Sequence, residues 1–410
     1  MGFSTGNDSR SGRAGQVRIP DPNPRPWYGV GIVAMRKLLP WFGIALLVLV
    51  AAVAFVQRAH REMLDFDVYR VAGVRAAAGE PLYRAEDGHW QFKYLPAFAL
   101  AVAPLTRLPP VGARAVWYFL SVALVVVLVS RAFALLPDRR RSAVFLVSLT
   151  VLAMGKFYVR EVGLGQSNLL LAVLVLAAVA CWYRGREIAA GALLAAATIV
   201  KPYAILFLPY LVARRKWSGV AGFTSVLLAA LVLPAARYGW SGNLGQLHGW
   251  WSVVTTSTAP NLAGQDNVSI AGMYAAWLGV GPAAGWLGAA TGLVLVVACA
   301  WAIQRGSRVA VPEYLDAALL LFAIPLLSPQ GWDYVLLVST PAVMLLLDRF
   351  EEFRAPARWL LFASLALAGL TFWDVLGREP YRALMMSRIV TVGALFQLAL
   401  VMRLRARGTA

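Results

Sequence analysis

Two carboxylates stand close together early in the chain, where residues 65–69 read D-F-D-V-Y. A D-x-D pair can hold a metal with a nucleotide diphosphate, or one carboxylate can accept the proton of an attacking hydroxyl. A third possibility is a pair of solvated loop acids. The stretch that follows, 68–75, is amphipathic, so it can lie along a membrane surface and fix the carboxylates at its start. We therefore take Asp65 and Asp67 as candidate catalytic bases.

Two lysines provide positive charge for an anion. Lys201 interrupts an apolar stretch, precedes Pro202 and has no acidic residue within ten positions on either side. A lysine so placed either extends its ammonium group to the membrane interface or binds an anion, and both possibilities stay open. Lys93, in the segment F-K-Y-L-P, is a second candidate for pairing with a phosphate.

A further set of side chains suits sugar hydroxyls, because amides donate and accept hydrogen bonds and aromatic rings offer stacking faces. Each also has a structural alternative, such as the capping of a helix by Ser167 or Asn168. The candidates for binding a sugar or an acceptor are Tyr69, Tyr94, Gln166, Asn168, His248, Gln265, Asn267, Trp332 and Asp333. The two cysteines, Cys181 and Cys299, both lie inside apolar runs, so we expect no disulfide or zinc framework.

The composition determines what kind of molecule must position these side chains. Of the 410 residues 60% are hydrophobic and 14% are charged, and the mean hydropathy is +0.66. Soluble proteins carry about 25% charged residues, so this chain cannot cover its apolar surface with polar groups. A soluble enzyme, a nucleic-acid-binding module and a disordered scaffold are excluded. The sequence predicts an all-α polytopic membrane protein.

Apolar runs mark the expected membrane crossings, each of which needs about 20 residues. They cover 38–57, 113–130, 142–158, 168–183, 218–237, 284–303, 314–330, 332–348, 358–376 and 384–403. Between 187 and 213 we expect two short helices that meet at Lys201-Pro202, because proline cannot supply a helical N–H. Runs 96–106 and 268–281 are short and are interpreted as re-entrant or interfacial. The total is a bundle of about 11–12 transmembrane helices.

The distribution of basic residues orients this bundle. With both termini on one side, that side receives 23 of the 38 Lys and Arg residues, Arg405 among them, and a net charge of +14. The opposite side has a net charge of +4. The positive-inside rule then places both termini in the cytoplasm and the protein in the cell membrane. The predicted domains are a disordered tail over 1–36, a transmembrane catalytic domain over 37–404 and a short tail over 405–410.

The outer face collects the polar residues. It receives a first outer loop, 58–112, which carries the two acids, and a second outer loop, 238–283. The Lys201-Pro202 break falls on the same face. Polar residues are costly near a bilayer, so their gathering on one face predicts a shared cavity. Nucleotide sugars are cytoplasmic, and the outer position therefore favours proton transfer over nucleotide binding for Asp65 and Asp67.

In their order along the chain, these stretches resemble a known family. D-F-D-V-Y-R with G-E-P-L-Y, K-Y-L-P, G-Q-S-N, T-I-V-K-P-Y with L-P-Y-L, and S-P-Q-G-W-D are similar to motifs of glycosyltransferase family 87, over residues 38–403. The resemblance implies the GT-C membrane fold. It also implies transfer of a sugar from a polyprenyl-phosphate donor to a glycolipid or glycan of the cell envelope. Actinobacterial members add mannose or arabinose, and for this chain we expect mannose.

The resemblance also implies roles for single residues. The family's base is a carboxylate in the first outer loop, which corresponds to Asp65 here, with Asp67 as the second candidate. Lys201 matches a lysine-proline pair at the cavity, where it would lie near the donor phosphate. The implied reaction inverts the anomeric carbon, and cationic groups stabilise the leaving phosphate. It needs no metal or other cofactor, because a phosphomonoester carries less charge than a nucleotide diphosphate.

One motif departs from the family pattern. Some relatives carry S-P-x-S-W followed by histidine, whereas this chain has Gly331 in place of that serine and Asp333-Tyr334 after the tryptophan. His89 and His248 are then the candidates for any histidine role. A transporter or lipid flippase is the alternative function, because a helical bundle with a lysine at a broken helix also fits that class. The absence of an internal repeat in the sequence favours the transferase.

Overall fold

The computed structural model describes residues 46–305 and 312–407. Contacts divide the chain into two units, Met1–Val53 and Ala54–Ala410, and the site described below belongs wholly to the second. The tail predicted over 1–36 lies outside the described residues, as do the start of the first predicted crossing and the last three residues of the chain.

The all-α class is confirmed. Within the described ranges the regular structure is helical, apart from an isolated bridge between Asn267 and Trp332. The part of the chain up to residue 213 contains η1 (Phe55–Ala59), α2 (Leu64–Ala78), η2 (Ala85–Trp90), α3 (Pro96–Val102), η3 (Ala103–Arg107), α4 (Pro110–Leu135), α5 (Ala143–Leu164), α6 (Asn168–Trp182), α7 (Glu187–Val200), η4 (Pro202–Leu206) and α8 (Phe207–Ala213).

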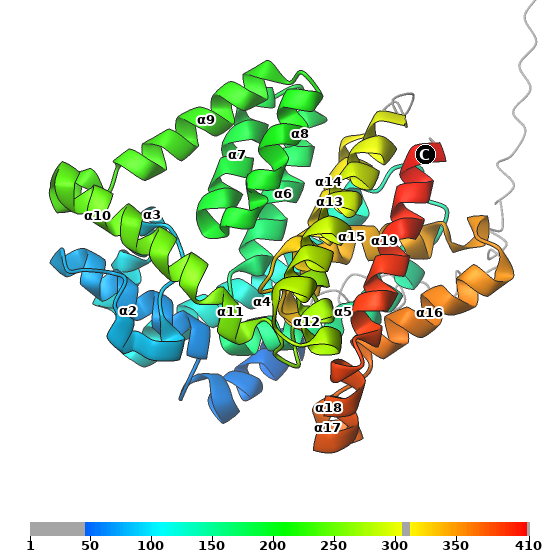
Figure 1. Cartoon of the computed structure of the whole chain (residues 1–410), viewed down its shortest axis with the longest axis horizontal. Coiled ribbons are helices and arrows are strands. Elements are labelled where there is room, and N and C mark those ends of the chain that lie inside the picture. The colour runs from blue at the N-terminus through cyan, green and yellow to red at the C-terminus, as the bar shows by residue number, and fades with distance from the viewer. Residues whose placement is uncertain (1–45, 306–311, 408–410) are drawn as a thin grey trace, which may run out of the picture. The chain divides into compact units, whose positions relative to one another are not determined.

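The second half of the chain is equally helical, and Figure 1 shows its elements in green, yellow, orange and red. It contains α9 (Trp217–Val232), α10 (Ala235–Thr256), α11 (Thr258–Asn261), α12 (Ile270–Leu278), α13 (Pro282–Arg305), α14 (Glu313–Leu327), η5 (Asp333–Ser339), α15 (Thr340–Asp348), η6 (Phe350–Glu352), α16 (Ala355–Gly369), α17 (Trp373–Leu376), α18 (Arg378–Met386) and α19 (Ile389–Arg407). Helices α14 and α15 are buried along nearly their whole length, and α5, α6 and α19 pack around them.

Several helices are suited to cross a membrane. Among the described residues α4, α5, α13 and α19 are long and apolar enough to do so alone, and α9 with α10 makes a fifth if the bent pair counts as one span. Helices α6, α7 and α16 are apolar but shorter. These features support a multi-pass membrane protein, whereas the total of 11–12 crossings stays a prediction.

The predicted crossing 218–237 ends early, and the outer loop predicted over 238–283 is largely helical. α9 stops at Val232, and the chain turns by 88° into α10, which crosses the end of α9 instead of continuing it (Figure 1). The exposed side chains of α10 include Trp240, Leu244 and Trp251. Their spacing places them on one stripe of the helix, as expected for a helix that lies on an apolar surface.

α2 carries both acids of the D-x-D pair in its first turn, where the unpaired N–H groups of a helix favour negative charge. The backbone N–H of Met63 donates to Oδ2 of Asp67 (3.3 Å). The amphipathic stretch predicted over 68–75 is therefore the continuation of a helix that begins just before the acids. The neighbouring helix α3 lies within the short run predicted over 96–106. It has seven residues and is therefore too short to cross a membrane.

A tight turn joins α5 to α6 and presents Gln166. Gly165 in this turn has φ +73°, and a Cβ at this position would lie 2.6 Å from Cβ of Phe66 in α2. Only glycine therefore permits both the left-handed turn and the close approach of α2. The indole N–H of Trp117 in α4 donates to the Gly165 carbonyl (2.9 Å), which ties a third helix to the turn.

The N-terminus of α6 has an unexpected cap. Glu161, in the last turn of α5, accepts hydrogen bonds from the backbone N–H of Leu169 (3.0 Å) and from Nδ2 of Asn168 (2.8 Å). The Ser167 hydroxyl makes no capping bond, so the predicted cap by Ser167 or Asn168 is wrong. A carboxylate from the preceding helix satisfies the helix end instead.

The helix break at Lys201-Pro202 is confirmed. α7 ends at Val200, Lys201 is extended with φ −145°, and Pro202 begins the short helix η4 that leads into α8. The ammonium group of Lys201 therefore projects from a break between two helices, not from a helix face.

The segment after α14 explains one departure from the family motifs. A Cβ on Gly331 would lie 2.0 Å from the Pro325 carbonyl oxygen, and the Gly331 carbonyl accepts a hydrogen bond from Val268 N–H (2.7 Å). A serine cannot occupy this position without moving the backbone. The crossing predicted over 332–348 is in fact the short helix η5 followed by α15.

Candidate active site

A cavity of about 370 Å³ lies between segments that are distant in the sequence. We call it the main cavity. Its walls come from the first turns of α2, the segment 89–94, the end of α5, the Lys201-Pro202 break, α11 and the segment 328–335. The lining includes Asp65, Tyr69, His89, Lys93, Tyr94, Arg160, Gln166, Lys201, Tyr203, Asp266, Gln330, Trp332 and Tyr334.

The two acids of the D-x-D pair point to different surroundings. Asp65 is half-buried and lines the main cavity. Burial raises the pKa of Asp65 above its ordinary value, while the charges of Lys201 and Lys93 and a hydrogen bond with Gln166 oppose that rise. Asp67 is held by Arg114, whose Nε and NH2 groups donate to its two carboxylate oxygens at 3.0 Å each. This pairing leaves Asp65 as the better-placed candidate for a base.

Gln166 is the centre of a hydrogen-bond cluster beneath Asp65. Its Oε1 accepts from the Tyr69 hydroxyl (3.1 Å) and from Nζ of Lys201 (3.0 Å), and its Nε2 donates to the Tyr334 hydroxyl (3.1 Å). The Tyr94 hydroxyl lies 2.6 Å from that of Tyr69. The side chains of Tyr69, Tyr94, Lys201 and Tyr334, which are distant in sequence, are thus held around the amide of Gln166. These hydrogen bonds fix this part of the cavity wall.

The two lysines of the main cavity keep their charge available. Lys201 donates to the Gln166 amide and lies 4.8 Å from the ring centroid of Tyr94, while Lys93 donates to Oε1 of Gln330 (3.3 Å). All of these partners are neutral. Burial, and then the neighbouring charge of Lys201, lower the pKa of Lys93. Two cations that repel each other across a cavity favour an anion between them.

The predictions from the sequence did not include the basic residues Arg160 and Lys156, which form ion pairs at the cavity wall. Arg160 in α5 donates to Asp333 (2.5 Å) and to Asp266 (3.0 Å), and Lys156 one turn earlier lies 3.4 Å from Asp333. The signal in the sequence is the pair of basic residues four apart at the end of the apolar run 142–158. Because i and i+4 share a helix face, this spacing indicates a polar face that needs acids from another element.

Other predicted residues lie behind the main cavity. Asn168 is fully buried and bonds the Tyr203 hydroxyl (2.8 Å) as well as Glu161, so it supports the wall instead of facing the cavity. Asp333 is also fully buried, in its ion pairs with α5. For both residues the expectation of a direct contact with the sugar is corrected to a structural contact.

The predicted residues of the second outer loop are dispersed. His248 is exposed on α10 and lies outside the main cavity, whereas His89 lines it. Asn267 is buried and donates to the carbonyls of Leu262 (3.0 Å) and Pro329 (2.8 Å), which fixes the loop. Gln265 also lies outside the lining, and its carbonyl accepts from Arg388 (2.9 Å). Between these two amides Asp266 does line the main cavity, as do Val254, Ser257 and Thr258 of the same predicted loop.

A family model gives the identity of the chain. The model of glycosyltransferase family 87 matches residues 92–329, more than half of the chain. The chain belongs to glycosyltransferase family 87. It is accordingly a membrane glycosyltransferase, and this membership favours the transferase over the transporter alternative.

The family match does not assign the site residues. It includes Lys93, Gln166 and Lys201, but it begins after Asp65 and ends before Trp332. The role of Asp65 therefore rests on the geometry of the main cavity and on the motif D-F-D-V-Y. No curated protein sequence matches the chain.

Proposed function

We propose that this glycosyltransferase moves a sugar, with mannose as the first candidate, from a polyprenyl-phosphate donor to a hydroxyl of an envelope glycolipid or glycan. The observation that carries the proposal is that Asp65 shares the main cavity with Lys93 and Lys201. A carboxylate suited to proton transfer and two cations suited to a phosphate then face the same space.

The reaction follows from this arrangement. The acceptor hydroxyl attacks the anomeric carbon on the side opposite the phosphate, and a new carbon–oxygen bond forms as the bond to the phosphate oxygen breaks. The phosphate leaves with the bonding electron pair, and the two lysines stabilise its charge. Asp65 accepts the hydroxyl proton. Attack from the opposite side inverts the anomeric configuration.

We further propose that the reaction takes place on the extracytoplasmic face, with both termini in the cytoplasm of a cell-envelope membrane. The excess of basic residues on the terminal side supports this orientation. The lipid-phosphate donor would enter from the outer leaflet, and the acceptor would approach from the aqueous side.

The direct test is a transfer assay in lipid nanodiscs with radiolabelled polyprenyl-phosphate mannose, and separately with the arabinose donor. Asp65→Asn is expected to lower kcat by about 100-fold or more, because loss of a general base costs this much. Asp67→Asn should lose less, since Asp67 is already paired with Arg114. Glu80→Gln, which removes an exposed carboxylate of the same outer segment, is the matched control and should keep the wild-type rate.

Three results would contradict the proposal. If the wild-type protein transfers neither sugar to any hydroxylic acceptor, the donor class is wrong. If Asp65→Asn and Asp67→Asn both keep the wild-type rate, the assignment of the base is wrong. Labelled sugar that crosses a vesicle membrane without a new glycosidic bond would support the transporter instead.

A further inference from the structure

A second hollow of about 290 Å³ adjoins the main cavity. Both are bounded by Leu64, Val68 and Trp90, which therefore form a shared wall. The remaining lining of the second hollow consists of Glu62, Asp67, Val71, Arg75, Asp87 and Phe92. Apart from Asp67, none of these side chains has a role in the proposed reaction.

The register of α2 places the two spaces on opposite sides of one helix. Asp65 and Tyr69, four residues apart, line the main cavity. Asp67, Val71 and Arg75, also at intervals of four, line the second hollow. Since residues four apart share a helix face, Asp65 faces the main cavity while Asp67 and Val71 face the second hollow, and the two spaces meet at the shared wall.

The segment before α3 continues this partition. His89, Gln91 and Lys93 line the main cavity, whereas Phe92 lines the second hollow and Trp90 borders both. Trp90 is 46% exposed, although it stands between two hollows. An indole with an open face at such a position is suited to stack on a sugar ring.

The charges of the two spaces differ in sign. Lys93, Arg160 and Lys201 outnumber the two carboxylates of the main cavity, which gives a net positive charge. The second hollow has an excess of one negative charge, that of Glu62, because Asp87 pairs with Arg75 and Asp67 pairs with Arg114. A phosphate is therefore attracted to the main cavity and repelled from the second hollow. A neutral ligand rich in hydroxyls fits the second hollow, because carboxylates accept hydrogen bonds from hydroxyls.

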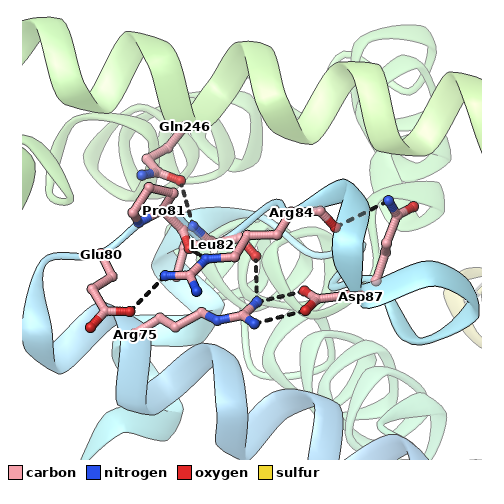
Figure 2. Close-up of polar contacts among 8 residues, drawn as sticks. Arg75, Glu80, Pro81, Leu82, Arg84, Asp87 and Gln246 are labelled. Atoms are coloured by element: carbon pink, nitrogen blue, oxygen red, sulfur yellow. Dashed lines mark hydrogen bonds and ion pairs between the residues drawn. The ribbon is translucent and has the colours of Figure 1, made fainter.

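The second hollow is formed in advance by a fixed loop. Figure 2 shows Arg75 donating to both oxygens of Asp87, at 2.5 and 2.7 Å. The side-chain amide of Gln246 in α10 accepts from Leu82 N–H (3.1 Å) in the same loop (Figure 2). The ion pair with Arg75 also lowers the pKa of Asp87, so this carboxylate is ionised at neutral pH. A site held in this way loses little conformational entropy when a ligand binds.

We propose that the second hollow binds the sugar ring of the acceptor. Trp90, which borders both spaces, stacks on the ring, and the acidic lining accepts hydrogen bonds from the ring hydroxyls. The reacting hydroxyl extends past Trp90 into the main cavity, where Asp65 lies. This inference rests on the proposed function, and it adds which of the two spaces each substrate occupies.

The test fills the second hollow from α2. Val71 is 40% exposed and lines only the second hollow, whereas Val74 is 46% exposed on the same helix and lines neither space. Val71→Trp is compared with the matched control Val74→Trp in nanodiscs. The probes are polyprenyl-phosphate mannose as donor and n-octyl α-mannoside, β-glucoside and β-galactoside as acceptors. We expect Val71→Trp to raise the acceptor KM by at least about tenfold and to leave the donor KM unchanged.

A second variant tests the second hollow without a change to the packed interior, so a misfolded protein cannot explain its effect. Glu62 is an exposed side chain at the rim of the second hollow, and Glu62→Gln removes a charge without changing the packed interior. It should raise the acceptor KM by about threefold, with the thermal midpoint of the wild type.

The possible outcomes separate the two proposals. A wild-type protein that uses none of the acceptors overturns the proposed function itself. A wild-type protein that transfers sugar, with the same acceptor KM in Val71→Trp and Val74→Trp, overturns only the acceptor site. A selective rise of the donor KM in Val71→Trp also overturns it, because the donor would then occupy the second hollow.

Discussion

At the scale of residues, the partners of a side chain at the main cavity cannot be read from the sequence alone. Asp65 and Asp67 are chemically identical and two positions apart, yet one faces two lysines and the other is held by Arg114. The difference arises because α2 points them in different directions. A base must be free to accept a proton, so the ion pair is the feature that separates the two candidates.

The pH dependence of transfer should report the environment of Asp65. The proposed reaction needs the carboxylate form of Asp65, and burial raises the pKa of this residue. As the pH is lowered, activity should therefore begin to fall at a higher pH than it would if Asp65 had the ordinary pKa of an aspartate. Lys201→Met removes the main cation that opposes this rise, so it should move the acid limb of kcat/KM to still higher pH. A limb that stays in place, or moves to lower pH, would contradict this coupling.

Removal of metal ions tests the roles of the lysines. We expect transfer to persist at the wild-type rate after treatment with EDTA, because in the proposed reaction Lys93 and Lys201 supply the positive charge at the leaving phosphate. Lys93→Met should raise the donor KM under the same conditions. Loss of activity in EDTA, restored by a divalent cation, would show that the charge comes from elsewhere.

At the scale of elements, α10 combines an exposed apolar stripe with a contact to a segment that lines the main cavity. One face carries the exposed Trp240, Leu244 and Trp251, while Trp250 donates its indole N–H to the carbonyl of Lys93 (3.2 Å). The bend of 88° after α9 prevents α10 from continuing that span. We infer that α10 lies at the outer interface, where tryptophan is favoured, and covers the main cavity from the lipid side.

Site-specific labelling tests the position of α10. In a background with Cys181 and Cys299 replaced by serine, a bimane label at Trp251→Cys should be quenched by lipid-borne nitroxides. The matched position is Gly245→Cys, about 120° around the helix, where an added Cβ meets no atom within 4 Å. A label there should be quenched by aqueous iodide instead. Equal quenching at both positions would rule out an interfacial α10.

At the scale of the whole molecule, a buried ion pair links helices far from the active site. Arg405 in α19 and Asp316 in α14 are both fully buried, with Nε and Oδ1 2.5 Å apart. The Tyr210 hydroxyl in α8 donates to the same carboxylate (3.1 Å), and Arg405 donates to the Ile303 carbonyl in α13 (3.1 Å). Arg405, which was counted among the basic residues facing the cytoplasm, is therefore part of the core.

Disruption of this pair should destabilise the protein without changing its chemistry. Asp316→Ala leaves the Arg405 charge buried without its carboxylate, which costs about 3–5 kcal/mol of the free energy of unfolding. We expect a clearly lower thermal midpoint, with wild-type KM values at low temperature. The double variant Asp316→Leu with Arg405→Leu should recover much of the loss. A wild-type midpoint for Asp316→Ala would show that the pair does not stabilise the fold.

The sequence by itself determined the class of the molecule and several of the segments that line the main cavity. Composition and apolar runs predicted an all-helical membrane protein, because the spacing of apolar residues is a local property. The break at Lys201-Pro202 followed from the chemistry of proline alone. The motifs likewise predicted the family, which the family match confirms.

The tertiary structure decided which polar residues face the same space. Asn168, Asn267 and Asp333 carry side chains that suit a sugar, yet each is used by a helix end, a loop or an ion pair. Arg160 and Asp266, more than a hundred positions apart, meet on the cavity wall. A local sequence pattern cannot show which partners these polar side chains have, because the partner of a buried polar group depends on the packing of distant helices. The separation of the main cavity from the second hollow has the same origin: it depends on where the segment around Trp90 packs against α2.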